Sequence, residues 1–195
     1  MIRRTRHFAG DALMLALCAG AAYGQHLAQG GLPDFHKVNE HLYRGGRPSA
    51  VGLRHLQQIG VKTVIDLQVP GERWAKENEL VEALGMRYFP IPMGRGFGVD
   101  LEQIQAALKL IENADHAPVY VHCRKGHDRT GVVIACFRIK DDGWSNAKAM
   151  EEANACKMSW LQVGKRRFIL DYRKESGSEV ANKTDLAVVA AKTGQ

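Results

Sequence analysis

Residues 118–137 read PVYVHCRKGHDRTGVVIACF. The stretch opens with an apolar, β-prone run and closes with the start of an apolar helical pattern. Between the two runs, Cys123 and Arg129 bracket five residues that include Gly126. A strand, a tight loop and a helix N-terminus form a geometry that binds a phosphate-sized anion, because main-chain N–H groups point into the loop. The stretch therefore predicts an anion-binding loop with a cysteine at its start.

Strand patterns alternate with helical patterns on both sides of this loop. The pattern predicts a hairpin over residues 35–44 and further strands over 61–67 and 86–92. Ser49, Asp100 and Ser145 stand where helix N-caps are expected, and a glycine-rich loop fills 93–99. Such alternation indicates an α/β fold, in which one domain has a central, mostly parallel sheet flanked by helices.

Three further details follow from local pattern. Gln103 occupies the position of a capping-box partner for Asp100. The run Gly45–Pro48 is typical of a turn. Residues 158–172 have the spacing of a last amphipathic helix, with Trp160 and Leu161 among its inward-facing residues.

The two ends of the chain differ in composition from its middle. Residues 1–24 combine three early arginines, an eleven-residue apolar run and small residues at a cleavage position. These features predict a signal peptide and an exported protein, either periplasmic or secreted. The apolar run is too short to span a membrane. We expect a linker over 25–34, a folded domain over 35–174 and a disordered tail over 175–195.

Overall composition is that of a globular enzyme. The chain has 195 residues and a net charge of +6, which suits an anionic substrate. It has no basic run with interleaved aromatics, so no nucleic-acid partner is expected. No cysteine and histidine spacing resembles a zinc site, and we expect neither a metal nor a cofactor.

The cysteines do not form a disulfide framework. Cleavage after residue 24 would remove Cys18 and leave Cys123, Cys136 and Cys156. Cys136 falls on an apolar helix face and is expected in the core. Whether it pairs with Cys156 stays open at this point.

The loop chemistry suits nucleophilic attack on phosphorus. Main-chain N–H groups from Arg124 to Thr130 can turn inward, and Gly126 permits the curvature that this requires. Arg129 offers a planar fork of donors that matches two phosphate oxygens, which lysine does not. The same donors and the helix dipole favour the thiolate form of Cys123.

Two neighbours of the nucleophile have supporting roles in this interpretation. Thr130 can donate its hydroxyl to the sulfur, and it can also serve as a helix N-cap. His122 is expected to fix the loop through hydrogen bonds to the backbone rather than to take part in catalysis directly.

The motif resembles that of the cysteine-dependent protein tyrosine and dual-specificity phosphatases, in particular exported bacterial proteins of the dual-specificity type. Their signature is matched at His122, Cys123, Arg129, Thr130 and Gly131. The resemblance extends roughly over residues 35–173. It implies a cysteine-phosphatase-like fold, so that 35–174 would be a phosphatase domain. We expect the protein to be a monomer.

The resemblance also implies a reaction. A phosphate monoester would be hydrolysed in two steps through a cysteinyl-phosphate intermediate, without a metal. The substrate would be a phosphorylated protein or a small-molecule phosphate ester.

One part of the family pattern is missing. A general acid usually lies in the loop after the 86–92 strand, but residues 92–99 contain no carboxylate. Asp100 is the first one, and helix capping already explains it. Asp128, inside the nucleophile loop, resembles an aspartate that some related phosphatases use. We therefore favour Asp128 over Asp100 as the acid, and Asp66 is a weaker candidate that is better explained as structural.

The loop is unusually basic. Arg124, Lys125 and His127, together with the backbone of Gly126 and Gly131, are the expected substrate-binding residues. Similar basic residues occur in tensin-type phosphoinositide phosphatases and in the atypical group acting on inositol pyrophosphates, so an inositol phosphate or phosphoinositide substrate stands beside a phosphoprotein. The alternative is that these side chains only face solvent.

Two other functions stay open at this point. A rhodanese-like sulfurtransferase also places a cysteine in an anion-binding loop, although such loops lack the closing Arg-Thr-Gly. An exported pseudophosphatase that only binds phospho-ligands would explain the missing acid. The intact Cys123 and Arg129 argue against a pseudophosphatase.

Overall fold

The computed structural model describes residues 30–69, 72–96 and 98–173, with the side chains of 72–75 left aside. The expected signal peptide, residues 25–29 of the expected linker and the expected tail lie outside these residues. The end of the expected linker, at residues 32–33, packs against the folded domain. Leu32 is 5% exposed and belongs to the core, and the Pro33 carbonyl accepts a hydrogen bond from the Gly46 N–H at 2.7 Å.

The centre of the molecule is a five-stranded sheet in the order β1-β2-β5-β3-β4. Its strands are β1 (His36–Asn39), β2 (Leu42–Gly46), β3 (Thr63–Asp66), β4 (Arg87–Pro90) and β5 (Val119–Cys123). The first two pair antiparallel as a hairpin, and the other neighbouring pairs are parallel. The expected α/β architecture with a mostly parallel sheet is confirmed.

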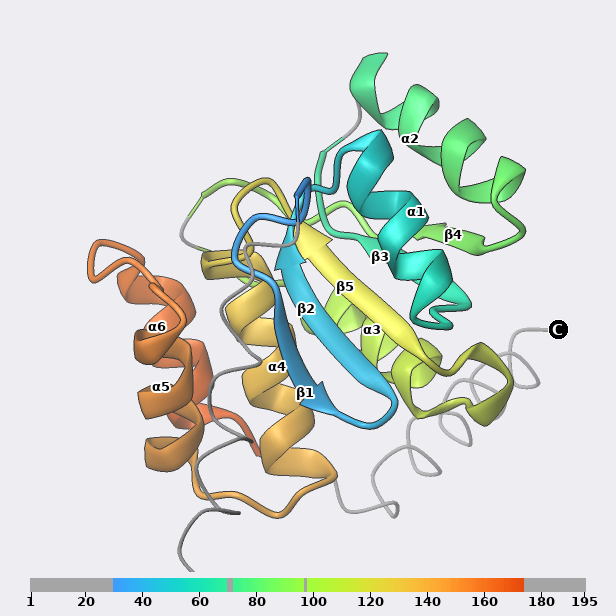
Figure 1. Cartoon of the computed structure of the whole chain (residues 1–195). Coiled ribbons are helices and arrows are strands. Elements are labelled where there is room, and N and C mark those ends of the chain that lie inside the picture. The colour runs from blue at the N-terminus through green and yellow to red at the C-terminus, as the bar shows by residue number, and fades with distance from the viewer. Residues whose placement is uncertain (1–29, 70–71, 97, 174–195) are drawn as a thin grey trace, which may run out of the picture.

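Helices cover both faces of this sheet (Figure 1). One face carries α1 (Ala50–Gln58) and α2 (Glu72–Ala83). The other carries α3 (Leu101–Glu112), α4 (Asp128–Lys140), α5 (Asn146–Ala155) and α6 (Val163–Asp171), and a short 3-10 turn, η2 (Ala114–His116), precedes β5. In the part of the chain that is described, no helix is both long and apolar enough to traverse a lipid bilayer.

The expected caps start three of these helices. Ser49 Oγ accepts the Gly52 N–H at 3.2 Å, and the Asp100 carboxylate accepts the Glu102 N–H at 2.9 Å. Ser145 caps α5 in the same way. Each cap satisfies a main-chain donor that the first turn of a helix leaves free.

Alternation along β5 sends neighbouring side chains to opposite faces of the sheet. Val119, Val121 and Cys123 join the core beneath α3 and α4. Tyr120 joins the second core beneath α1 and α2, and alternation directs His122 to that same side. The strand that carries the nucleophile therefore contacts both halves of the interior.

The last helix is shorter than its pattern predicts. It begins at Val163, and Trp160 and Leu161 are 76% and 55% exposed rather than inward-facing. The Ser159 N–H donates to the Asp128 carboxylate at 2.8 Å. Residues 158–162 lie outside α6, and the prediction of a helix there is wrong.

Two further local predictions are also wrong. Gly45 and Gly46 end β2 instead of forming a turn, because they pair with His122 and Cys123 of β5. Gln103 donates to the Pro92 carbonyl at 2.8 Å, so it does not complete a capping box.

The described cysteines are all unpaired. Cys136 is buried in the core as expected, and Cys156 is half-buried. The possible Cys136–Cys156 disulfide is absent from the described residues.

Candidate active site

The nucleophile loop joins the end of β5 to the start of α4. The Gly126 N–H points at the Cys123 sulfur, with a nitrogen–sulfur distance of 3.3 Å. Gly126 has a φ of +82°, and a Cβ atom there would lie 2.4 Å from the Gly45 carbonyl carbon. Only glycine fits this backbone and this close approach. The buried guanidinium of Arg44 donates to the Gly126 carbonyl at 3.0 Å and holds the next peptide group of the loop.

The surroundings of Cys123 favour its thiolate. Burial alone would raise the pKa of the Cys123 thiol, but hydrogen bonds from the side chain and backbone of Thr130, the charge of Arg129 and the Gly126 N–H together bring the pKa below its ordinary value. The Thr130 hydroxyl makes no other hydrogen bond within the described residues. The site therefore stabilises an anionic sulfur despite its burial.

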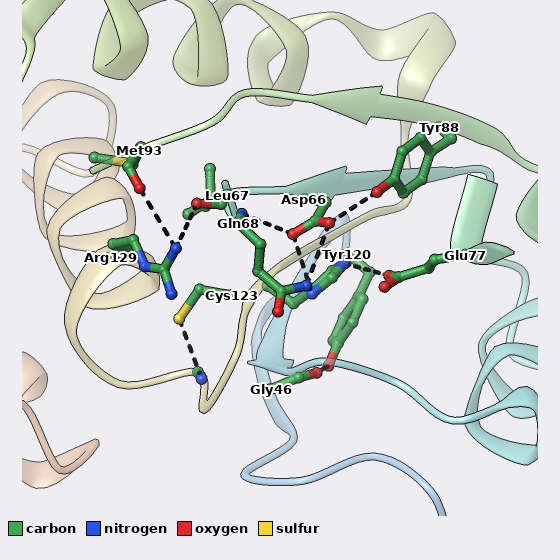
Figure 2. Close-up of polar contacts among 12 residues, drawn as sticks. Gly46, Asp66, Leu67, Gln68, Glu77, Tyr88, Met93, Tyr120, Cys123 and Arg129 are labelled. Carbon is green, nitrogen blue, oxygen red and sulfur yellow. Dashed lines mark hydrogen bonds and ion pairs between the residues drawn. The ribbon is translucent and has the colours of Figure 1, made fainter. Parts of the chain in front are cut away.

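Arg129 lies beside the sulfur (Figure 2). Its Nη1 donates to the Leu67 carbonyl at 3.0 Å and to the Met93 carbonyl at 3.4 Å. These carbonyls come from the end of β3 and the start of the glycine-rich loop. They fix the guanidinium next to Cys123, where it can hold an anion against the nucleophile.

A pocket of about 210 Å³ opens above these two residues. Its lining combines the nucleophile with cationic and polar side chains, namely Arg95, Cys123, Arg124, Lys125, Asp128, Arg129, Gln162 and Lys165. Five of the expected site residues thus share one pocket. The other five expected site residues do not line the pocket but lie in or around the loop. They are His122, Gly126, His127, Thr130 and Gly131.

Those residues support the loop from several directions. His127 Nε2 lies 2.5 Å from the Asp34 carboxylate, which also pairs with Lys157, so this imidazole is held outside the pocket. A Cβ on Gly131 would approach the Met158 side chain to 2.8 Å, which makes it a packing position. His127, not Thr130, occupies the N-cap of α4, so the capping alternative for Thr130 is wrong.

His122 is fully buried on the opposite face of the sheet. Its Nε2 lies 2.7 Å from Glu77 Oε1, and its Nδ1 lies 3.8 Å from Asp66 Oδ1. His122 thus contacts side-chain carboxylates. The prediction that it binds the loop through hydrogen bonds to the backbone is wrong.

The candidate acids occupy different surroundings. Asp128 lines the pocket, with Oδ1 bound to the Ser159 N–H. Asp100 is exposed, caps α3 and is not among the residues that line the pocket. Asp66 is buried and accepts hydrogen bonds from the Tyr88 hydroxyl and the Gln68 N–H, both at 2.8 Å.

Sequence reasoning missed Lys165 and Gln162 of the pocket. Lys165 is 2% exposed, and its ammonium donates to the Gly96 carbonyl and to Gln162 Oε1. Burial lowers the pKa of Lys165 below its ordinary value. Its position four residues before the buried Ile169 places it on the inward face of α6, and that spacing is the signal that was available.

One group of side chains has metal-ligand character. Among the described residues, Asp66, Glu77 and His122 place ligand atoms within 4.8 Å of one another. The 2.7 Å between His122 Nε2 and Glu77 Oε1 is a direct contact. An ion bound to both atoms at about 2.0–2.2 Å would require a wider separation in a tetrahedral site, so the group is an ion pair and not a preformed metal site.

A thiolate-stabilised cysteine beside a fixed arginine, at a strand–loop–helix junction, defines the class of cysteine-dependent phosphatases. A family model described as "Tyrosine phosphatase family" matches residues 32–191. The chain belongs to this family.

Individual relatives agree with this assignment. The chain is 33% identical over 127 residues to the putative tyrosine-protein phosphatase OCA1 of Debaryomyces hansenii, covering 61% of this chain and 64% of that protein. It is 30% identical over 120 residues to the dual specificity protein phosphatase TpbA of Pseudomonas aeruginosa, covering 61% of this chain and 52% of that protein. The chain thus spans between half and two thirds of these relatives.

The fold is shared with solved structures. The core catalytic domain of the PP-IP phosphatase SIW14 from S. cerevisiae superposes with a TM-score of 0.64 at 22% identity, covering 80% of this chain and 94% of that one. These matches do not favour the sulfurtransferase or the pseudophosphatase alternative.

Proposed function

We propose that this protein hydrolyses phosphate monoesters, with Cys123 as the nucleophile. The observation that carries the proposal is the position of the Cys123 sulfur on the wall of a cationic pocket, beside Arg129 and 3.3 Å from the Gly126 nitrogen. These surroundings bring the pKa of the thiol below its ordinary value. The sulfur attacks phosphorus, an S–P bond forms and the P–O bond to the leaving group breaks. Water then attacks phosphorus, the S–P bond breaks and inorganic phosphate leaves.

The neighbouring groups have distinct tasks in this scheme. Arg129 and the loop N–H groups bind the non-bridging oxygens, where negative charge gathers in the transition state. Thr130 stabilises the thiolate when it is released in the second step. These tasks agree with the contacts that lower the pKa of Cys123.

Asp128 is the proposed proton donor to the leaving group. Its place in the pocket lining supports this role, whereas Asp100 is exposed at a helix cap. Comparing Asp128→Asn with Asp100→Asn tests the choice. We expect Asp128→Asn to lose about 10²-fold in kcat with phenyl phosphate and much less with para-nitrophenyl phosphate, whose leaving group needs little protonation. Near-normal rates for Asp128→Asn on both esters would refute it.

The charge of the pocket supports a substrate with more than one phosphate. Arg95, Arg124, Lys125 and Lys165 line it in addition to Arg129, against the single carboxylate of Asp128. The names of two relatives point to two substrate classes, phosphoprotein for TpbA and PP-IP for SIW14. We propose that an inositol phosphate or phosphoinositide is turned over beside phosphotyrosine. A panel in which phosphotyrosine peptides far outpace every inositol phosphate would contradict this.

The first experiment is hydrolysis of para-nitrophenyl phosphate by wild type and Cys123→Ser. Rapid quenching in acid should trap a phosphorylated Cys123 peptide, detected by mass spectrometry, in wild type alone. Turnover without any such peptide, or equal turnover by both proteins, would refute the cysteinyl-phosphate route.

We further propose that the protein is exported and acts as a monomer. Arginines before an apolar run in residues 1–24 support export. N-terminal sequencing of protein recovered from outside the cytoplasm should start near residue 25, and light scattering should give the mass of one chain. A full-length N-terminus in the cytoplasm would contradict export.

A further inference from the structure

A buried ion pair lies on the face of the sheet opposite the nucleophile. His122 Nε2 is 2.7 Å from Glu77 Oε1, and the two side chains are 0% and 4% exposed. Glu77 comes from α2, which packs on that face, and makes no other hydrogen bond within the described residues. Among the described residues, its ion-pair partner is the imidazole of His122, which directly precedes Cys123 in β5.

The other groups around His122 are also acidic or neutral. Asp66 of β3 lies 3.8 Å from Nδ1, and its far oxygen accepts the hydroxyl of Tyr88 from β4 at 2.8 Å. Tyr120 of β5 stacks on the imidazole with 5.6 Å between ring centres. In Figure 2, Asp66, Glu77 and Tyr88 converge on one buried region beside Cys123.

This arrangement favours a positive imidazole. A buried carboxylate is unfavourable without a partner of opposite charge, so Glu77 stabilises protonated His122. Burial acts to lower the pKa of His122, but the charge and contact of Glu77, with Asp66 and Cys123 adding to them, raise it above 6.5.

We propose that Glu77 is a positioning residue for the nucleophile: it holds His122 as a buried imidazolium, and that cation favours the thiolate of Cys123 from the far side of the sheet. The inference rests on the proposed function only in that it concerns the same sulfur.

Coupling between the two sites works in both directions. The negative sulfur raises the pKa of His122. By thermodynamic reciprocity, the cationic His122 lowers the pKa of the Cys123 thiol by the same interaction. On the loop side, the thiolate of Cys123 is stabilised by Thr130, Arg129 and Gly126. The Glu77–His122 pair stabilises the same thiolate from the opposite face of the sheet.

The test is the pH dependence of Cys123 alkylation in full-length Glu77→Gln. Glutamine keeps the shape and removes the charge, so the alkylation midpoint should rise by at least about half a pH unit. The matched control is Glu79→Gln, an exposed carboxylate on the same helix, which should leave the midpoint unchanged. An unchanged midpoint in folded Glu77→Gln would overturn the proposal.

Activity should show the same shift. On the acid side of the midpoint, kcat/KM should fall by about threefold to tenfold, and on the alkaline side it should return to the wild-type value. A uniform loss at every pH would indicate a merely structural role for Glu77 and would count against the proposal. Glu77→Asp should recover part of the wild-type midpoint.

A second measurement covers the case in which the variants do not fold. Nitrogen-15 NMR of the wild-type imidazoles should show His122 with both ring nitrogens protonated at pH 7.5, and a neutral ring would overturn the proposal. Alkylation and NMR need no turnover. Absence of phosphatase activity with a shifted midpoint would therefore refute the proposed function and leave this inference standing.

Discussion

Arg129 Nη1 donates to the main-chain carbonyl of Leu67 at 3.0 Å. This hydrogen bond joins the first turn of α4 to the end of β3, so two elements far apart in the sequence orient one guanidinium. No ion pair links Arg129 to a carboxylate among the residues that the structure describes. The side chain is thus oriented without being neutralised, and it is prepared for an anionic substrate before that substrate binds.

Replacing Arg129 with lysine should therefore be costly. Lysine keeps the charge but loses the planar fork and the tie to Leu67. We expect kcat/KM for para-nitrophenyl phosphate to fall by about 10²–10³-fold. Arg167→Lys, at an arginine that is 83% exposed, is the control and should change nothing. A loss smaller than tenfold for Arg129→Lys would show that charge alone suffices.

The cysteines should differ in reactivity with pH. The contacts of Thr130, Arg129 and Gly126 bring the pKa of the Cys123 thiol below its ordinary value, so its thiolate persists to lower pH than that of an ordinary cysteine. Burial raises the pKa of Cys136 and Cys156, so both stay protonated through the same range. Iodoacetamide at pH 7 should alkylate Cys123 far faster than the other two, as peptide mass spectrometry would reveal. Preferential labelling of the half-buried Cys156 would contradict the prediction.

Gly126→Ala should impair both folding and catalysis. The substitution adds backbone strain at a φ of +82° and also places a Cβ 2.4 Å from Gly45. Gly60→Ala is a matched comparison, because Gly60 has a φ of +86° but open space around the added Cβ. We expect Gly60→Ala to lose about 1 kcal/mol of unfolding free energy with full activity. Gly126→Ala should lose more in chemical denaturation and nearly all activity, and equal effects would refute the role of the close approach.

Lys165→Met should change which substrates are preferred. Its ammonium lies at the pocket wall, where it can bind a second anionic group. Losing one charge-assisted hydrogen bond should lower kcat/KM for a bisphosphate by about tenfold and affect a monophosphate little. The exposed Lys109 provides the control, as Lys109→Met. An equal loss on both substrates would place Lys165 in the general support of the loop instead.

Local chemistry explains what the sequence could predict. Ser49, Asp100 and Ser145 act within three residues of themselves, so their capping roles can be read from the chain alone. The loop from Cys123 to Arg129 is likewise contiguous, and its spacing predicts an anion site. The hairpin and the parallel sheet follow from apolar periodicity, which depends on neighbouring residues only.

Long-range contacts explain which parts of the structure could not be predicted from the sequence. The helix expected over 158–172 begins only at Val163, and the segment before it is joined to α4 by the Asp128–Ser159 hydrogen bond, a contact between residues far apart in the chain. In the sequence, Glu77 looks like an ordinary solvent-exposed glutamate of a helix. Only the packing of α2 on the sheet makes it the partner of His122. No local pattern marks such pairings, because they depend on how complete elements meet.

Asp34 precedes the first strand, yet it binds His127 inside the nucleophile loop. A shortened protein that starts at Phe35 would retain the whole sheet and the complete signature, but its loop would lack that anchoring carboxylate. Anyone designing a minimal version for crystallisation or screening should therefore begin upstream of Leu32. A start chosen from the strands alone would risk a folded protein with a loosened reaction centre.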